Sequence, residues 1–290
     1  MTSQARRADW VLGLATLLWG LSFIVVKGAL ASSTPLAFTA LRFGFAAVVL
    51  TPFTSLRPPY PRAELHAGAL LGALLAIGFA AQTVGLVYTT PARSAFIVAS
   101  SSVLAPVVAF VVVRERPRLW VVVALGLAGA GMYLLTAPDA GGLNRGDLWT
   151  LVTALSFGGQ IVAVAHLSRQ HDALRLVWME TVVTAVGAGV AAVSLEHVRV
   201  GWAPALAGAL AYSAVLATAV ALVWQMRAQR HMSSARAALI FCAEPVFAAL
   251  ASWVWFGERL SALQWSGGGL ILAGMLLTEV PRRAVVGESV

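Results

Sequence analysis

The chain has 290 residues, of which 59% are hydrophobic and 11% are charged, whereas about a quarter of the residues in soluble domains are charged. This composition and a mean hydropathy of +0.83 exclude a soluble globular protein and predict a polytopic membrane protein surrounded by a lipid bilayer. The formal net charge of +8 lies in short connections between apolar runs, so we attribute it to membrane topology and expect no nucleic-acid partner.

Charged, proline and glycine clusters divide the chain into ten apolar runs, each long enough to cross a hydrocarbon core about 30 Å thick. The predicted transmembrane helices cover residues 10–30, 35–53, 65–88, 91–113, 119–136, 148–167, 174–195, 204–226, 234–256 and 262–278. The first run is too long for the apolar part of a cleavable signal. Since no soluble-looking block separates the runs, we expect residues 1–290 to form a single membrane domain.

Basic residues in the short connections predict the orientation of the helices. With a cytoplasmic N-terminus, the inner connections carry thirteen arginines, namely Arg6, Arg7, Arg57, Arg62, Arg114, Arg116, Arg118, Arg169, Arg175, Arg227, Arg230, Arg282 and Arg283. The outer connections carry five basic residues, namely Lys27, Arg93, Arg145, Arg199 and Arg259. Both termini are therefore predicted to be cytoplasmic, which requires an even number of spans.

The second half of the chain repeats the first. Offsets of 138 residues at the start and 143 residues later align Asp9 with Asp147, Gly20 with Gly158, Arg42 with Glu180, and Gln82 with Gln225. Because each half, 9–136 and 147–279, has five spans, the second must enter the bilayer in the opposite sense. The predicted fold class is therefore an all-α integral membrane protein with ten transmembrane helices in a 5+5 inverted-topology repeat. Such repeats are typical of alternating-access transporters, which bind substrate near the midplane between the halves.

Two prolines fall inside predicted helices, where each removes a backbone donor. Pro106 lies in run 91–113 and Pro245 in run 234–256. We predict that both break or loosen their helices, which is tolerated in a membrane where the backbone lines a cavity. Ser102 stands where the repeat would place the counterpart of Pro245, so the two halves are not expected to mirror each other at this point.

Several short motifs carry a family resemblance that covers essentially the whole chain. They are Trp19-Gly20 with Phe23, the stretch from Pro245 to Gly257-Glu258-Arg259, Gly267 to Gly274, and the weaker equivalents Glu115-Arg116 and Gly126 to Gly131. With these motifs the chain resembles the EamA family of the drug/metabolite transporter (DMT) superfamily, and within it the YddG-like exporters of aromatic amino acids.

The resemblance implies a secondary transporter in the plasma membrane of a bacterium, the inner membrane, that works by alternating access. Its expected substrates are small amphipathic metabolites, above all aromatic or other apolar amino acids, and the expected direction is export. In the YddG-like exporters an aromatic-lined central cavity lies among the first, third, fourth, sixth, eighth and ninth spans.

Deep aromatic and polar side chains are the candidates for this cavity. Apolar walls with a few polar groups suit a small amphipathic ligand, and aromatic rings favour stacking on an aromatic substrate. The candidates are Trp19, Phe23, Phe79, Gln82, Ser100, Ser101, Phe157, Gln160, Tyr212, Gln225, Phe241 and Glu244. For each of them, packing in the core or bonding between helices is the alternative role.

Glu244 is a carboxyl group about ten residues from either end of its predicted helix. An ionisable group at such depth is costly and marks a functional site by default, so Glu244 is our candidate for proton coupling. The alternative is a protonated Glu244 that bonds the carbonyl groups freed by Pro245.

Three further ionisable groups fall within the predicted helices. Arg42 and Glu180 are equivalent under the repeat but lie toward opposite faces, so we do not expect them to pair. Snorkelling to the interface or bonding a neighbouring helix is favoured for them over a gate, and Lys27 is expected to snorkel at the outer end of the first span.

Other functions fit the sequence less well. A nucleotide-sugar or phosphate-ester antiporter would need Lys or Arg at the midplane, where only Arg42 is deep, whereas a drug exporter and a passive channel stay open as alternatives. An enzyme is not expected, because the five histidines lie at run ends or in loops without H-E-x-x-H spacing and no P-loop occurs. The single cysteine, Cys242, excludes an internal disulfide and a thiol cluster, so we expect no cofactor and no metal.

Small-residue faces occur on the fifth and tenth spans. Gly126 with Ala130, and Gly267-Gly268-Gly269 with Gly274, predict close helix approach. The sequence leaves open whether this approach lies within the monomer or in a homodimer.

Overall fold

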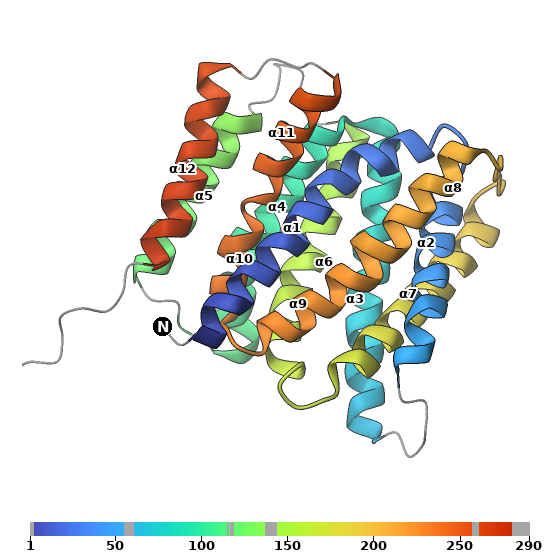
Figure 1. The fold of residues 1–290 in the computed structure, drawn as a ribbon, viewed down its shortest axis with the longest axis horizontal. Coiled ribbons are helices and arrows are strands. Elements are labelled where there is room, and N and C mark those ends of the chain that lie inside the picture. The colour runs from blue at the N-terminus through green and yellow to red at the C-terminus, as the bar shows by residue number, and fades with distance from the viewer. Residues whose placement is uncertain are drawn as a thin grey trace, which may run out of the picture.

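The computed structural model describes residues 3–54, 61–114, 116, 119–136, 144–256 and 261–279. Over these residues the chain is helical, with no strand and only one isolated bridge, between Ser33 and Val200. The predicted all-helical class is thereby confirmed. The helices run in alternating directions across one elongated bundle (Figure 1).

The helices follow the predicted apolar runs closely. Their bounds are α1 Ser3–Ala29, α2 Pro35–Leu50, a 3-10 turn η1 Thr51–Phe53, α3 Arg62–Tyr88, α4 Pro91–Val113, α5 Leu119–Thr136, α6 Arg145–Leu167, α7 Ala173–Leu195, α8 Pro204–Ala211, a π-helical segment η2 Tyr212–Val220, α9 Ala221–Gln229, α10 Ser234–Phe241, α11 Glu244–Phe256 and α12 Ala262–Glu279.

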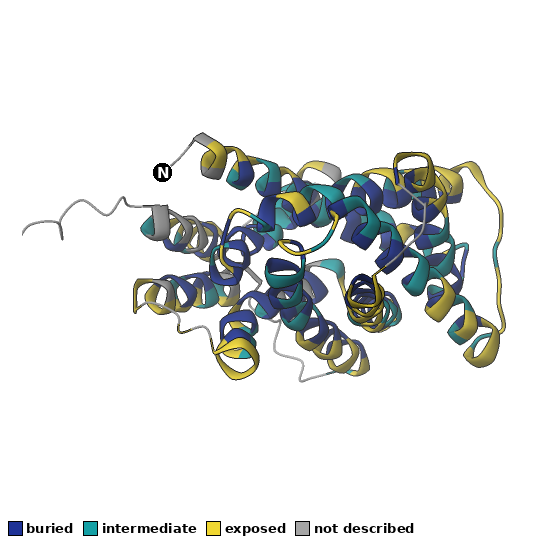
Figure 2. Ribbon diagram, turned by 90° about the horizontal axis from the view of Figure 1, so that it is seen from below, coloured by how far each residue is buried: buried dark blue, intermediate teal, exposed yellow. Residues whose placement is uncertain are grey.

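The protein is a multi-pass membrane protein. Within the described residues, seven helices are long and apolar enough to cross a bilayer, and two shorter apolar helices lie at Ile97–Val113 and Val122–Gly131. Large apolar side chains cover the outside of the bundle, as Val111, Val193 and Val254 show with 70%, 79% and 70% of their surface exposed. Figure 2 shows buried residues toward the middle and exposed residues along the outer helix faces.

Four helices extend three or more residues beyond a predicted bound: α6 begins at Arg145 rather than residue 148, α9 ends at Gln229 rather than residue 226, and two others begin early. α1 begins at Ser3 rather than residue 10, and α3 begins at Arg62 rather than residue 65. At α3 the amide of Glu64 donates to the carbonyl of Pro61, so the helix starts outside the apolar run. Hydropathy locates the part of a helix in the hydrocarbon core, whereas backbone hydrogen bonds continue into the polar interface.

The two internal prolines behave differently. The predicted run 234–256 is interrupted at Cys242-Ala243, and Pro245 is the second residue of α11. An N–H group at this position has no partner within the helix, so its absence in proline costs no hydrogen bond. The predicted break at Pro106 is wrong, because α4 continues from Pro91 to Val113 with Pro106 inside it.

Glycines on α3 allow two other helices to approach closely. A Cβ atom at Gly72 would lie 2.5 Å from the Cβ of Val183 on α7, and one at Gly78 would lie 2.3 Å from the Phe157 ring on α6. α3 accordingly packs mainly on α6 and α7. Small residues at such contacts are the usual means by which membrane helices pack tightly.

At one end of the bundle, the connection after α7 forms hydrogen bonds with the start of α2. The amide of Leu36 donates to Glu196 Oε1 at 2.9 Å, and the amide of Gly201 donates to the carbonyl of Ser32 at 2.8 Å. At the same end Lys27 of α1 bonds the end of a neighbouring helix, and its predicted snorkelling to the interface stays a prediction. Its ammonium group donates to the carbonyls of Leu86 and Thr89 at the C-terminus of α3, where orphan carbonyls attract a cation.

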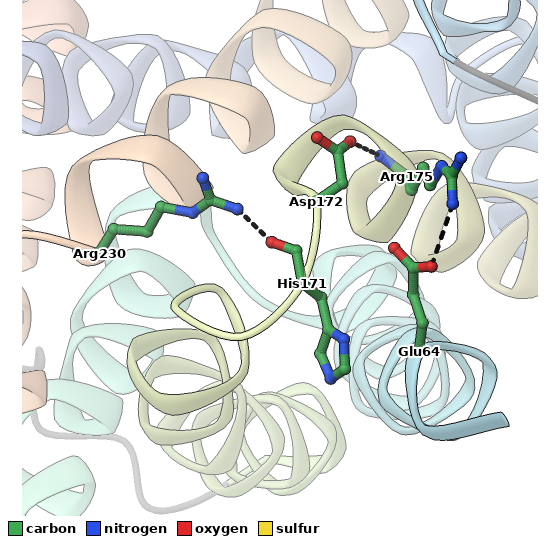
Figure 3. Close-up of polar contacts among 5 residues, drawn as sticks. All are labelled: Glu64, His171, Asp172, Arg175 and Arg230. Carbon is green, nitrogen blue, oxygen red and sulfur yellow. Dashed lines mark hydrogen bonds and ion pairs between the residues drawn. The ribbon is translucent and has the colours of Figure 1, made fainter. Parts of the chain in front are cut away.

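At the opposite end, arginines join separate helices (Figure 3). Arg175 of α7 forms an ion pair with Glu64 of α3 at 3.4 Å, and Arg230, just after α9, donates to the carbonyl of His171 in the α6–α7 connection. The first turn of α7 is capped by Asp172, whose carboxylate accepts from the amide of Arg175 at 2.9 Å. These contacts fix α3, α7 and α9 relative to one another.

α5 and α12 lie side by side at one edge of the bundle (Figure 1). Gly274 makes this approach possible, because a Cβ atom there would lie 2.7 Å from the carbonyl oxygen of Ala124. Gly126, Gly268 and Gly269 have no neighbour among the described residues within 4 Å of such an atom. Part of the predicted small-residue face is therefore used within the monomer.

We expect Gly72→Ala to destabilise the protein by about 1 to 3 kcal/mol, because the new methyl group overpacks the contact with Val183. Gly44→Ala in α2 is the matched control, since a methyl group added there would have no neighbouring atom within 4 Å. Thermal unfolding of both variants in detergent micelles measures the difference. Equal midpoints for the two variants would contradict the packing described for α3 and α7.

Candidate functional site

A central cavity is enclosed by α1, α3, α4, α6, α9, α10 and α11. Fourteen residues line it, namely Trp19, Ser22, Leu75, Phe79, Gln82, Val98, Ser101, Phe157, Gln160, Ile161, Leu222, Gln225, Phe241 and Glu244. The space open to the centre of a water molecule is about 60 Å³, whereas one buried water needs roughly 10 to 15 Å³. In this conformation the cavity therefore has room for several waters.

Two aromatic pairs form opposite parts of the wall. Phe79 and Phe157 meet edge to face with ring centroids 5.0 Å apart, and Trp19 and Phe241 do so at 5.6 Å. This geometry directs the positive edge of one ring at the negative face of the other. The four rings come from α3, α6, α1 and α10, so the wall joins helices from both halves of the chain.

Amide side chains supply the polar part of the wall. Gln225 Nε2 of α9 donates to Gln160 Oε1 of α6 at 3.1 Å, and Gln82 lies on α3. All three are buried, with 8% or less of their surface exposed. Each amide carries both a donor and an acceptor, so the cavity offers either kind of partner to a ligand.

Glu244 enters the cavity at the helix break. It is the first residue of α11, after the interruption at Cys242-Ala243, and it is half-buried. Among the described residues its carboxyl group makes no hydrogen bond, so the alternative in which it bonds the carbonyls freed by Pro245 does not hold. α1 comes close at this point, since a Cβ atom at Gly20 would lie 2.9 Å from the Glu244 carbonyl oxygen.

The structure brings nine of the twelve predicted cavity residues together. Trp19, Phe79, Gln82, Ser101, Phe157, Gln160, Gln225, Phe241 and Glu244 line the cavity. Their contact with a substrate stays a prediction.

Three predicted residues lie elsewhere. Phe23 is buried in an apolar cluster with Val26 and Val98, Ser100 donates to the carbonyl of Ile97, and the Tyr212 hydroxyl donates to the carbonyl of Leu18. Each of these side chains packs on, or bonds, a neighbouring helix or the backbone of its own helix.

Five lining residues were not predicted, namely Ser22, Leu75, Val98, Ile161 and Leu222. Their spacing from the predicted residues along each helix could have identified them. Most of them lie three or four positions from a predicted residue on the same helix, as Leu75 does from Phe79, and such positions share a helix face.

Behind the cavity wall, Arg42 of α2 is buried with 2% of its surface exposed. Its Nε donates to Thr218 Oγ1 at 2.7 Å and its Nη2 to the carbonyl of Ala217 at 3.2 Å. Its guanidinium group also lies 4.6 Å from the centroid of the Phe79 ring, a cation–π contact. Of the two roles predicted for Arg42, the structure shows the bond to a neighbouring helix and not snorkelling.

The partners of Arg42 belong to the π-helical segment η2. This segment interrupts the regular winding of the helix Pro204–Gln229 for nine residues. The Ala217 carbonyl also accepts from Trp19 Nε1 at 2.9 Å. Extended π-helical windings are rare and occur mostly at functional sites, and here the winding serves side chains that form or support the cavity wall.

Membrane-length helices around an aromatic and amide-lined cavity define a polytopic membrane protein with an internal cavity. The comparison with known families specifies it further: the chain belongs to the EamA-like transporter family, whose model matches residues 6–137 and again residues 144–280. The protein is therefore a membrane transporter of the DMT superfamily, as the sequence motifs predicted.

Known proteins resemble the chain over nearly its full length. It is 32% identical over 274 residues to an uncharacterized transporter of Archaeoglobus fulgidus, which covers 94% of this chain and 86% of that protein. It is 27% identical over 275 residues to the uncharacterized inner membrane transporter YedA of Escherichia coli K12, covering 91% and 88% of the two chains. A solved crystal structure shares the fold, with a TM-score of 0.77 at 18% identity and coverage of 94% and 98%. The names of these relatives specify no substrate.

We expect Arg42→Lys to destabilise the protein by about 1 to 3 kcal/mol more than Arg42→Met. Lysine keeps the buried charge but loses the planar fork that reaches Thr218 and Ala217 and the stacking on Phe79. Methionine removes the charge and fills a similar volume. Unfolding in micelles ranks the two variants, and a lysine variant at least as stable as the methionine variant would contradict this role of Arg42.

Proposed function

We propose that the protein is a secondary transporter that exports small amphipathic metabolites, most of all aromatic or other apolar amino acids, through the central cavity. The observation that carries the proposal is the joining of four aromatic rings with amides and a carboxyl group in one internal space. An aromatic or branched apolar side chain would stack on the rings. The Glu244 carboxylate would bind the ammonium group of an amino acid, and the glutamine N–H groups would bind its carboxylate.

The composition of the cavity wall favours this substrate class over a phosphate ester. No lysine or arginine is among the described residues that line the cavity, and Arg42 is engaged by η2 and Phe79. A desolvated phosphate group requires such cations.

For the mechanism we propose alternating access by ten transmembrane helices in a 5+5 inverted repeat. The double match of the family model supports two equivalent halves. Helix packing supports the two halves too. In the proposed repeat α2 corresponds to α7 and α5 to α12, and each of these helices packs on its own counterpart. Likewise α1 corresponds to α6, and α3 corresponds to the helix formed by α8, η2 and α9. The contact of α3 with α6 therefore has its equivalent in that of α9 with α1, and the contact of α3 with α7 has its equivalent in that of η2 with α2.

We further propose that the protein lies in the bacterial inner membrane with both termini in the cytoplasm. The excess of arginine in the predicted inner connections supports the orientation, and the likeness to an inner membrane transporter supports the location. The open glycines Gly268 and Gly269 support a homodimer through α12.

Counterflow of L-phenylalanine tests the substrate class. Proteoliposomes preloaded with unlabelled L-phenylalanine are expected to accumulate the radiolabelled amino acid, and Phe241→Ala is expected to lower the initial rate about tenfold or more by removing one wall of the cavity. Phe53→Ala is the matched control, because Phe53 is 69% exposed at the outside of the bundle.

Other results of this assay would count against the proposal. Absence of counterflow for L-phenylalanine, L-tryptophan and L-leucine alike would contradict the substrate class. Uptake that does not depend on the internal amino acid would indicate a channel.

We expect Glu244→Gln to abolish the stimulation of L-phenylalanine transport by an imposed pH gradient, while counterflow at equal pH persists at a lower rate because the amide oxygen still accepts from the substrate ammonium group without a charge. The amide retains the shape of the side chain but does not exchange a proton. Transport rates in proteoliposomes with and without the gradient provide the measurement. A stimulation equal to that of the unmodified protein would contradict proton coupling at Glu244.

A further inference from the structure

A second carboxyl group lies in the interior, outside the residues that line the cavity. Glu180 of α7 has 0% of its surface exposed, and neither of its carboxyl oxygens has a hydrogen-bond partner among the described residues. An isolated ionised carboxylate in an apolar interior is strongly destabilising unless it is paired. Glu180 therefore needs a cation, and no side chain in the described part of the chain supplies one.

Glu180 lies one helical turn from the cavity. A Cβ atom at Gly72 of α3 would lie 3.1 Å from the Cα of Glu180, and Thr184 Oγ1, one turn along α7, donates to the carbonyl of Gly72 at 3.2 Å. Leu75, three residues after Gly72 on α3, lines the cavity. The same helix, α3, therefore packs on α7 beside Glu180 and contributes Leu75 to the cavity wall.

A chain of two amides joins Glu180 to the cavity. Gln160 Nε2 is buried without a hydrogen-bond partner among the described residues, as are both carboxyl oxygens of Glu180, so the amide has the donor that an ionised Glu180 lacks. The other end of the same amide, Oε1, accepts from Gln225 Nε2 at 3.1 Å. Gln160 and Gln225 both line the cavity.

The charged and titratable groups on the helices around Glu180 are directed elsewhere. They are Arg42 on α2, which bonds Thr218; Arg175 on α7 and Glu64 on α3, which pair with each other; the exposed His66 on α3; Tyr212 on η2, which bonds Leu18; His166 on α6, which bonds Val162; and the exposed Arg227 on α9. Within the described residues, none of these charged groups bonds the carboxyl oxygens of Glu180.

An amide between two partners has two orientations, each with a donor at one end and an acceptor at the other. When Glu180 is ionised, it accepts from Gln160 Nε2, Gln160 Oε1 accepts from Gln225 Nε2, and Gln225 Oε1 is left for the cavity. When a carboxyl oxygen carries a proton, its O–H donates to Gln160 Oε1. Both amides then turn over, and Gln225 presents an N–H group to the cavity.

We propose that Glu180 is a proton-binding site of the transporter, and that Gln160 and Gln225 convert its protonation into a change from acceptor to donor at the cavity wall. The proton comes from the aqueous phase and adds to a carboxylate oxygen, and no other covalent bond changes. The protonation of Glu180 stands independently of the proposed function, whereas its effect on a ligand rests on the cavity being the substrate site.

Infrared difference spectra of the purified full-length protein test the protonation directly. As the pH is stepped between about 4 and 10, we expect the carbonyl stretch of a protonated buried carboxyl group to appear and disappear. Glu180→Gln is expected to remove one component of this band, the other belonging to Glu244, whereas Glu196→Gln, in the connection that bonds the start of α2, is expected to leave both components in place. A titrating spectrum that is unchanged by Glu180→Gln would overturn the proposal.

Gln160→Leu keeps Glu180 and therefore tests the contact between these two residues even if Glu180→Gln does not fold. We expect it to shift the frequency of the band, because the carboxyl group loses the amide as its partner. A band with the same frequency in this variant and in the unmodified protein would overturn the relay.

Binding of L-phenylalanine to the same samples tests the effect on the cavity. The affinity is expected to change with pH in the unmodified protein and to lose that dependence in both Glu180→Gln and Gln160→Leu. A dependence retained in both variants would overturn the relay. If L-phenylalanine does not bind at all, the proposed substrate class fails, and the infrared result still decides whether Glu180 takes up a proton.

Discussion

One carbonyl oxygen, that of Ala217, connects three separate parts of the bundle. It accepts from Trp19 of α1 at 2.9 Å and from Arg42 of α2 at 3.2 Å. In an apolar bundle each polar group must find its partner within the protein, and the π-helical winding of η2 is where these two side chains find theirs. Trp19 is itself a cavity wall, and Arg42 supports Phe79, another wall. The shape of the cavity therefore depends on an irregularity in a single helix.

In the proposed inverted repeat, the two halves of the chain share their packing and differ in their chemistry. Arg42 in the first half has a neutral partner set and carries a fixed charge, whereas its counterpart Glu180 is a buried carboxyl group without a partner among the described residues. Likewise α4 continues past Ser101, whereas its counterpart is interrupted just before Glu244. Both carboxyl groups that bear on the cavity come from the second half, so proton chemistry is expected there and structural support in the first half.

Hydropathy predicted the all-helical class and most of the helix bounds, because a bilayer imposes a length and an apolar composition on each helix. The same reasoning identified most of the cavity wall, since deep polar residues such as Gln160 are rare enough to be informative. It did not predict the π-helical winding of η2, which depends on donors that Trp19 and Arg42 bring from other helices. Nor did it show how Glu180 is surrounded, because that depends on contacts between helices and not on the pattern along one.

Site-directed labelling tests most directly whether the cavity is the substrate site. Cys242 is the only cysteine of the chain and is fully buried; after its replacement by alanine, Ser101→Cys places one thiol in the cavity wall. The account predicts that a small thiol reagent modifies this cysteine and that L-phenylalanine slows the modification, with less protection in the Phe241→Ala background. A modification rate that no substrate of the protein alters would contradict the assignment of this cavity as the transport site.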